Sequence, residues 1–193
     1  MQRSLVLVGM LVLAGACTKA LPPPVAARPP ATPAAARHAL GPFTVVTPPE
    51  WTAKPFTSSM RAADYLVSAA PGEEAELVIY YFGVDGAGSI DDNLDRWFGQ
   101  FTQPDGRTSR DAAKIEKTTF AGQEAIVVSV SGHFSAAAMA GVSEAVDKDN
   151  QSMLAAIIAS PKGPYYFRLL GASKTVDASA ARFRAMLDSL QVR

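Results

Sequence analysis

The sequence predicts an α+β domain in which a mainly antiparallel sheet is flanked by helices. Six apolar residues at positions 77–82 lie between Glu76 and Gly83, and their number and aromatic content favour a buried strand over a helix. Two amphipathic patterns, over residues 89–101 and 176–190, predict helices with one apolar face each. Such a face needs a surface to pack on, and the sheet provides it.

The first of these helices is predicted to begin at Ser89. The Ser89 hydroxyl can accept a hydrogen bond from the backbone of Asp92, whose carboxylate can reach back to the cap, as in a capping box. The glycine-rich residues 85–88 before it are typical of a turn. The apolar stripe that we expect to pack on the sheet consists of Ile90, Leu94, Trp97, Phe98 and Phe101.

The rest of the domain is predicted as short strands and a closing helix. The closing helix is expected to be capped by Asp177 and to bury one face, formed by Val176, Ala180, Phe183, Leu187 and Leu190. Residues 102–111 are expected to be a loop, and residues 135–151 a loop or short helix. Further strands are predicted at residues 43–46, 60–67, 114–120, 124–134, 153–159 and 165–170.

The N-terminus has the features of a secretory signal peptide, predicted over residues 1–16. Arg3 supplies a positive start, and residues 5–13 are apolar but too few to span a bilayer, which takes about 20. Cys17 follows three small residues and is the single cysteine of the chain. Without a second cysteine the domain cannot be held by an internal disulfide, so its stability must come from its core.

The segment from Leu13 to Cys17 resembles the lipobox of bacterial lipoproteins. In that family the cysteine becomes the first residue of the mature protein and carries acyl chains such as palmitate, so the resemblance implies a membrane anchor on Cys17. Ala14 stands where the family more often has leucine, and the alternative is a secreted protein whose thiol happens to lie there. Thr18, in place of the aspartate that retains enterobacterial lipoproteins in the inner membrane, implies the outer membrane of a Gram-negative bacterium.

Residues 17–42 are predicted to be the lipidated cysteine and a linker, and residues 43–193 a single domain. Seven prolines lie between Thr18 and Pro42, and such a segment buries too little apolar surface to order itself. His38 is therefore expected to be solvated. The linker is mildly basic, but its three charges are too few to predict specific binding to acidic lipid.

The order of these elements, with Phe43 and then Pro49-Glu50-Trp51 near the start and a helix at the end, resembles the PsbP/Mog-type fold. It is also similar to uncharacterised bacterial lipoproteins that carry such a domain. The resemblance covers most of residues 43–193. Members of that fold mostly bind or help assemble other proteins and share no catalytic set, so it implies a binding function and no particular partner.

Candidate chemistry is sparse. A Ser-His-Asp triad would need His133, yet the sequence has no G-x-S-x-G elbow, and a structural role is expected instead. Residues 85–89 could face an anion at a helix start, but they lack the lysine of a phosphate loop. An acidic cluster is compatible with a calcium site, but helix capping explains most of it; the cluster comprises Asp85, Asp91, Asp92, Asn93 and Asp95.

Aromatic residues are numerous, and core positions are favoured for them over a binding surface. Arg96 points off the apolar helix face and could belong to a contact patch, although a solvated arginine is the simpler interpretation. Nucleic acid is not expected, because four of the 18 basic residues precede Phe43 and the domain keeps 14 against 18 acids. The aromatic residues considered are Tyr80, Tyr81, Trp97, Phe98, Tyr165, Tyr166 and Phe167.

We therefore predict a lipid-anchored protein of the cell envelope that binds an envelope protein and is not an enzyme. No catalytic, cofactor-binding or metal-binding residues are assigned; Cys17 is the one predicted modification site. The alternative is a lipoprotein that holds a small apolar ligand or lipid between sheet and helix, bordered by Phe98, Phe101 or Phe183. An enzyme that uses His133 or the clustered aspartates is the third option.

Overall fold

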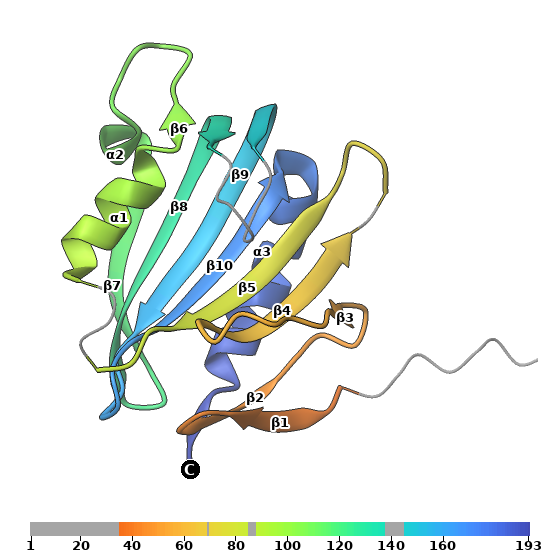
Figure 1. Ribbon diagram of the computed structural model, residues 1–193, viewed down its shortest axis with the longest axis vertical. Coiled ribbons are helices and arrows are strands. Elements are labelled where there is room, and N and C mark those ends of the chain that lie inside the picture. The colour runs from red at the N-terminus through yellow and green to blue at the C-terminus, as the bar shows by residue number, and fades with distance from the viewer. Residues whose placement is uncertain (1–34, 69, 85–87, 138–144) are drawn as a thin grey trace, which may run out of the picture. The chain divides into compact units, whose positions relative to one another are not determined.

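An antiparallel sheet of eight strands organises the described part of the chain (Figure 1): seven follow one path, and β7 pairs with β8 off that path. The computed structural model describes residues 35–68, 70–84, 88–137 and 145–193. The chain divides into two units, Met1–Ala31 and Thr32–Arg193, and the first lies outside the described residues. The predicted signal peptide, Cys17 and most of the linker therefore have no structural description.

Each predicted strand is present, and additional short strands accompany them. In the large sheet the order is β3-β4-β5-β10-β9-β8-β6, and β7 also pairs with β8; all pairs are antiparallel. The strands of this sheet are β3 (Thr52–Ala53), β4 (Arg61–Ser68), β5 (Ala75–Tyr81), β6 (Phe101–Thr102), β7 (Lys114–Phe120), β8 (Gln123–Ala136), β9 (Val146–Ile158) and β10 (Tyr165–Ala172).

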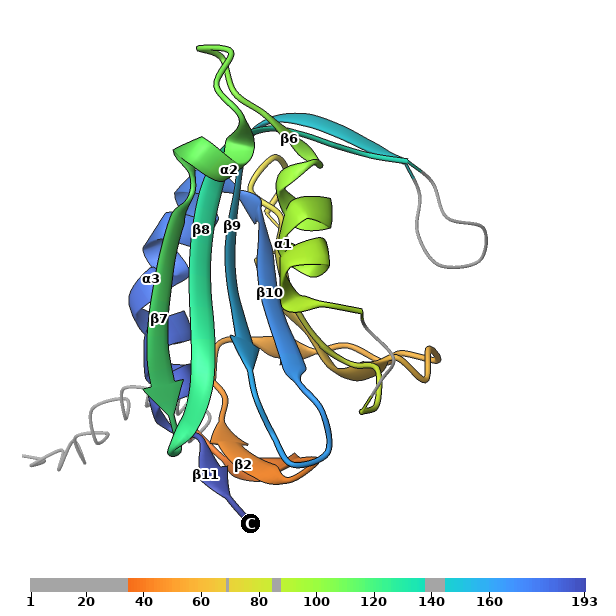
Figure 2. The same cartoon turned by 90° about the vertical axis from the view of Figure 1, so that its left-hand side faces the viewer.

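Helices cover both faces of the sheet. Helix α3 (Ser173–Asp188) lies on one face and helix α1 (Ile90–Phe98) on the other, as the edge-on view shows (Figure 2). Because successive strand residues point to opposite faces, each helix packs on its own set of strand side chains. We call these surfaces the α3 face and the α1 face. A four-residue helix, α2 (Ser109–Ala112), lies in the segment predicted as a loop.

The core has two layers, one on each side of the sheet. On the α3 face, Val176 and Phe183 pack with strand residues such as Ile79. On the α1 face, Trp97 packs with Tyr166 and other strand residues. Both helices thus pack on the sheet as predicted, and the α+β class with a mainly antiparallel sheet is confirmed.

A second, smaller sheet contains the start and the end of the described chain. It has the order β1-β2-β11, formed by β1 (Arg37–Leu40), β2 (Phe43–Val46) and β11 (Gln191–Val192). The folded region thus begins before Phe43, where the sequence suggested its start, because β1 pairs with β2 along its length. His38 is not freely solvated: its Nε2 lies 2.8 Å from the Tyr65 hydroxyl and 3.1 Å from that of Thr47.

Several local predictions are wrong. Asp177 does not cap α3, which begins four residues earlier after Ala172 and has no side-chain cap. Ile90 is 40% exposed rather than part of the buried stripe, and Phe101 belongs to β6 rather than to the helix. Residues 146–151, mostly polar, are strand rather than loop, because they form the first part of β9 and pair with the last part of β8.

The predicted capping box is confirmed. The Ser89 hydroxyl accepts from the backbone nitrogen of Asp92 at 3.0 Å, and the Asp92 carboxylate accepts from the Ser89 backbone at 3.3 Å. These bonds fix the start of α1 even though residues 85–87, part of the predicted glycine-rich turn, lie outside the described residues. Among the described helices none is long and apolar enough to cross a membrane.

Candidate functional site

Helix α1 leaves parts of its sheet face open. Its nine residues bury Leu94, Trp97 and Phe98 against the middle strands, and clefts remain on either side of this contact. One, of about 690 Å³, lies beside the β7–β8 hairpin, and we call it the hairpin cleft. The other, of about 290 Å³, includes Arg168, and we call it the Arg168 cleft.

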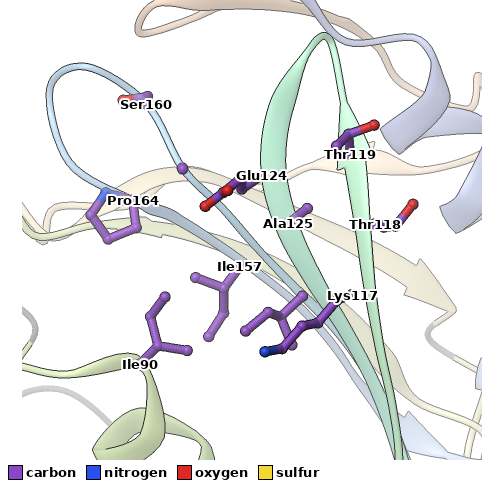
Figure 3. Close-up of a pocket in the computed structure, with 11 residues that line it drawn as sticks. Ile90, Lys117, Thr118, Thr119, Glu124, Ala125, Ile157, Ser160 and Pro164 are labelled. Carbon is purple, nitrogen blue, oxygen red and sulfur yellow. The ribbon is translucent and has the colours of Figure 1, made fainter.

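The hairpin cleft has an apolar floor and a charged rim (Figure 3). Ile157 of β9 forms the middle of the floor, and Ile90 at the start of α1 faces it from the other side. Lys117 and Glu124 come from the two strands of the hairpin and carry opposite charges. The complete lining is Ile90, Lys117, Thr118, Thr119, Glu124, Ala125, Ile126, Ile157, Ala159, Ser160 and Pro164.

Two tight turns shape the hairpin cleft. The β7–β8 turn has two central residues, Ala121 at φ 51° and Gly122 at φ 73°, as in the type I′ turns that suit two-residue hairpins. The β9–β10 loop is closed by the Ser160 hydroxyl, which donates to the carbonyl of Gly163 at 2.6 Å. Gly163 in turn packs against the backbone of Gly83, so the loop is held close to the segment that leads toward α1.

The rim charges of the hairpin cleft are available to a ligand. Within the described ranges, neither Lys117 nor Glu124 makes a side-chain hydrogen bond or ion pair. Exposed apolar side chains lie nearby in the chain: Val84 precedes α1, and Ile115 lies two residues from Lys117 on the same face of β7. An open apolar floor between unpaired charges of both signs suits a peptide segment or an amphipathic molecule.

Arg168 is the principal feature of the second cleft. Tyr166 lies on the α1 face, so Arg168, two residues further along β10, lies on that face too. Its guanidinium carbon is 6.0 Å from the centre of the Tyr80 ring, and that of Arg61 is at the same distance. The lining of the cleft comprises Glu74, Ala75, Glu76, Val78, Phe134, Val146, Lys148, Gln151, Arg168, Leu170 and Gly171.

Ion pairs surround the Arg168 cleft. Arg61 is paired with Asp64, and Lys54 with Glu76. Burial raises the pKa of the Asp64 carboxyl, and the charge of Arg61 opposes this effect. One oxygen of Asp64 is shielded from solvent without a hydrogen-bond partner among the described residues. This part of the sheet therefore carries buried charge that the fold does not fully compensate.

His133 lies on the rim of a third cleft, near the end of β8. Its Nδ1 is 2.8 Å from Asp149, and its Nε2 is 2.9 Å from Asp147. The hydrogen bond that His133 donates to Asp149 raises the pKa of the imidazole, and the charge of Asp147 acts in the same direction. Because both ring nitrogens face carboxylates, this arrangement does not offer the Ser-to-His hydrogen bond that a triad requires.

The acidic cluster considered for calcium is divided among other partners. Arg110 pairs with both Asp91 and Asp95, and Asp92 serves the helix cap. Asn93 is buried and bonds the carbonyl of Ser89 at 2.8 Å; Asp85 lies outside the described residues. Among the described residues, no three or more His, Cys, Asp or Glu side chains lie together in a way that could hold a metal ion.

The aromatic residues mainly belong to the core. Trp97, Phe98, Tyr165, Tyr166 and Phe167 are buried, as the core interpretation predicted. Tyr80 and Tyr81 are half-buried, and the Tyr81 hydroxyl donates to the carbonyl of Lys162 at 2.5 Å. Arg96 is exposed, and its guanidinium donates to Asn93 on the same helix.

Arg168 was not singled out from the sequence, although a signal was present. It stands between Phe167 and Leu169 in an otherwise apolar strand, and a charge in such a run is unusual unless it is paired or functional. Its neighbours in space come from distant parts of the chain, since Tyr80 is on β5 and Arg61 on β4.

Comparison with known proteins identifies the fold. No protein-family profile matches the chain, and no curated protein matches it. Among solved structures, that of cyanobacterial PsbP (CyanoP) from Synechocystis sp. PCC 6803 is similar, with a TM-score of 0.50 and 15% identity over 88% of this chain and 99% of that one. A protein of unknown function, PA94 from Pseudomonas aeruginosa, has a TM-score of 0.46 and 12% identity over 82% of this chain and 97% of that one. The domain therefore has a PsbP-like fold, a mainly antiparallel sheet with a few helices.

Proposed function

We propose that this protein is a lipid-anchored binding protein of the cell envelope, without enzymatic activity, and that its hairpin cleft receives a segment of a partner protein. The observation that carries the proposal is the open apolar floor between Lys117 and Glu124, whose charges have no ion-pair partner among the described residues. Protein interfaces commonly combine an apolar centre with a polar rim. The opposite rim charges would orient a segment that carries complementary charges.

The anchor is the first part of the proposal to test. The lipobox-like segment before Cys17 supports it, and Thr18 supports an outer-membrane location. Several acyl chains hold a protein firmly at a membrane, because each buried methylene contributes about 0.8 kcal/mol. Mass spectrometry of the mature N-terminus should find Cys17 as the first residue with acyl chains attached. A free thiol on Cys17, or cleavage elsewhere, would overturn this part.

The partner is tested by photo-crosslinking from the cleft. A photoreactive amino acid at Lys117 should give a discrete adduct in intact cells, because that side chain lies on the cleft rim. The matched control position is Asp177, which is exposed on α3 at the opposite side of the sheet. The substitution Ile90→Arg should weaken the Lys117 adduct by placing a charge on the apolar side of the cleft. Equal adducts from both positions, or none from Lys117, would count against the proposal.

The second candidate is a lipoprotein that holds a small apolar ligand or lipid. The hairpin cleft favours it by volume, since ligand pockets typically measure about 300–1,000 Å³ and this cleft has about 690 Å³. The residues first expected to border such a pocket, Phe98, Phe101 and Phe183, are instead packed in the core. Native mass spectrometry of the purified protein should then detect a bound molecule that Ile90→Arg releases. An unliganded mass would remove this candidate.

A further inference from the structure

Among the described residues, no carboxylate forms an ion pair with the guanidinium of Arg168. Its Nε is shielded from solvent and has no hydrogen-bond partner among the described residues. Its contact with the ring of Tyr80, at 6.0 Å, orients the group but does not neutralise it. A charge held in such a place is costly unless it is paired and hydrogen-bonded.

The carboxylates around the Arg168 cleft already have cationic partners. Glu76 pairs with Lys54, and Glu74 lies 3.8 Å from the Lys148 ammonium. Asp64, on the neighbouring strand, pairs with Arg61. Among the described residues around this cleft, Arg168 is therefore a cation without a carboxylate partner.

The surroundings of Arg168 mainly disfavour its charged form. Burial lowers the pKa of its guanidinium, and the charges of Arg61 and Arg96 add to this, while Tyr80 and Glu76 oppose it. An arginine nevertheless stays protonated at any physiological pH. A bound anion would offset both the burial and the repulsion from the other two arginines.

We propose that the Arg168 cleft binds a small monocarboxylate with a short apolar tail, its carboxylate on the guanidinium of Arg168. The planar guanidinium matches a carboxylate or a phosphate through paired hydrogen bonds. Glu74 and Glu76 in the lining disfavour the second charge of a phosphate. The volume of about 290 Å³ limits the ligand to a small molecule, and the apolar tail would lie against Val78 and Leu170.

The binding test uses sodium hexanoate with the full chain carrying Cys17→Ser, so that no lipid competes. Titration followed by amide NMR should give saturable shifts, with roughly millimolar affinity for so small a ligand. The shifted amides should cluster at Val78, Val146 and Leu170 and leave Ile126 of the hairpin cleft unchanged. Inorganic phosphate should bind more weakly than hexanoate. Equal binding of the two would overturn the carboxylate assignment, and unsaturable or scattered shifts would overturn the site.

Two matched variants assign the site to Arg168. Arg168→Met should weaken hexanoate binding about tenfold or more, because a hydrogen bond to a charged group is lost. Removal of the unmatched charge should also raise the thermal midpoint of the unliganded protein. Lys162→Met, which removes the same charge from the exposed β9–β10 loop, should leave hexanoate binding unchanged. An equal loss of hexanoate binding in both variants would overturn the proposal. If Arg168→Met does not fold, the position of the shifted amides in the parent protein decides whether hexanoate binds in the Arg168 cleft.

The result is independent of the proposed protein-binding function. Hexanoate binding is read at the Arg168 cleft, whereas the crosslinking experiment reads the hairpin cleft, and no residue lines both. Either proposal can therefore be refuted while the other stands.

Discussion

Trp97 of α1 packs edge-to-face on Tyr166 of β10, with their ring centroids 6.1 Å apart and their planes at 89°. Both side chains are nearly inaccessible, at 4% and 1% exposure. The pair therefore joins the helix to β10, in the middle of the sheet. This contact fixes the position of α1, whose first residue, Ile90, lines the hairpin cleft.

Replacement of Trp97 by alanine should strongly destabilise the domain. Loss of a buried aromatic side chain costs about 3–5 kcal/mol, through lost burial and the cavity that remains. The free energy of unfolding, measured by urea denaturation, should fall by that amount. Phe56→Ala is the control, because Phe56 is 42% exposed, and it should change stability by less than about 0.5 kcal/mol. Equal midpoints for Trp97→Ala and the parent protein would contradict the buried contact.

The capping box of α1 should be measurable as an energetic coupling. Ser89→Ala removes the acceptor for the Asp92 backbone and should cost about 1 kcal/mol. Asp92→Ala removes the reciprocal bond. Because the two side chains also bond each other, the double variant should lose less stability than the sum of the single variants. Strict additivity in urea denaturation would show that the two bonds act independently.

Much of this fold could be predicted because its signals are local. The apolar run of β5, the capping residues Ser89 and Asp92, and the β7–β8 hairpin each depend on adjacent residues. The pairing of the hairpin strands, the burial of β5 and the capping of α1 could therefore be inferred from the spacing of residue types along the chain. The closing helix was also predicted from its apolar period, although Asp177 lies inside it rather than at its start.

The missed features depend on distant residues. Residues 146–151 are mostly polar and exposed, so they show no strand period, and their pairing with β8 is what makes them strand. His38 looks like part of a linker in the sequence, but it forms a hydrogen bond with the hydroxyl of Tyr65, 27 positions away. Arg168 is visible in the sequence as a charge among apolar residues. That no described carboxylate pairs with it follows only from which carboxylates the fold brings near it.

The contact between Gly163 and Gly83 should not tolerate a side chain. A Cβ on Gly163 would lie 2.4 Å from the carbonyl oxygen of Gly83, and the φ of +101° is itself unfavourable for alanine. Gly163→Ala should therefore lower the free energy of unfolding by more than about 2 kcal/mol.

Gly72→Ala is the matched control for this prediction. Gly72 has a φ of +76°, but nothing lies within 4 Å of its added Cβ. Only the backbone strain remains, so the cost should be about 1 kcal/mol. Similar losses for the two variants would mean that the loop moves to accommodate the methyl group, and the position of Pro164 in the hairpin cleft would then not be fixed by Gly83.

His133 should make the stability of the domain depend on pH. The hydrogen bond that the imidazole donates to Asp149, helped by the charge of Asp147, raises the pKa of the imidazole above its ordinary value of 6.5. The folded state then binds a proton more tightly than the unfolded state. This contribution to stability is fully present below the unfolded pKa and is lost as the pH rises through the raised folded pKa.

The variant His133→Gln removes this contribution and provides the measurement. The difference in free energy of unfolding between the parent protein and His133→Gln should be larger at about pH 5.5 than at about pH 8.5, at low salt. Asp149→Asn should reduce the pH dependence, because it removes the charge of the carboxylate that contributes most to the shift. NMR titration of the parent protein should show one imidazole with a raised pKa that is absent from His133→Gln. If the stability difference is the same at both pH values, the carboxylates of Asp147 and Asp149 do not hold the imidazolium in solution, and the ends of β8 and β9 are joined there by backbone pairing alone.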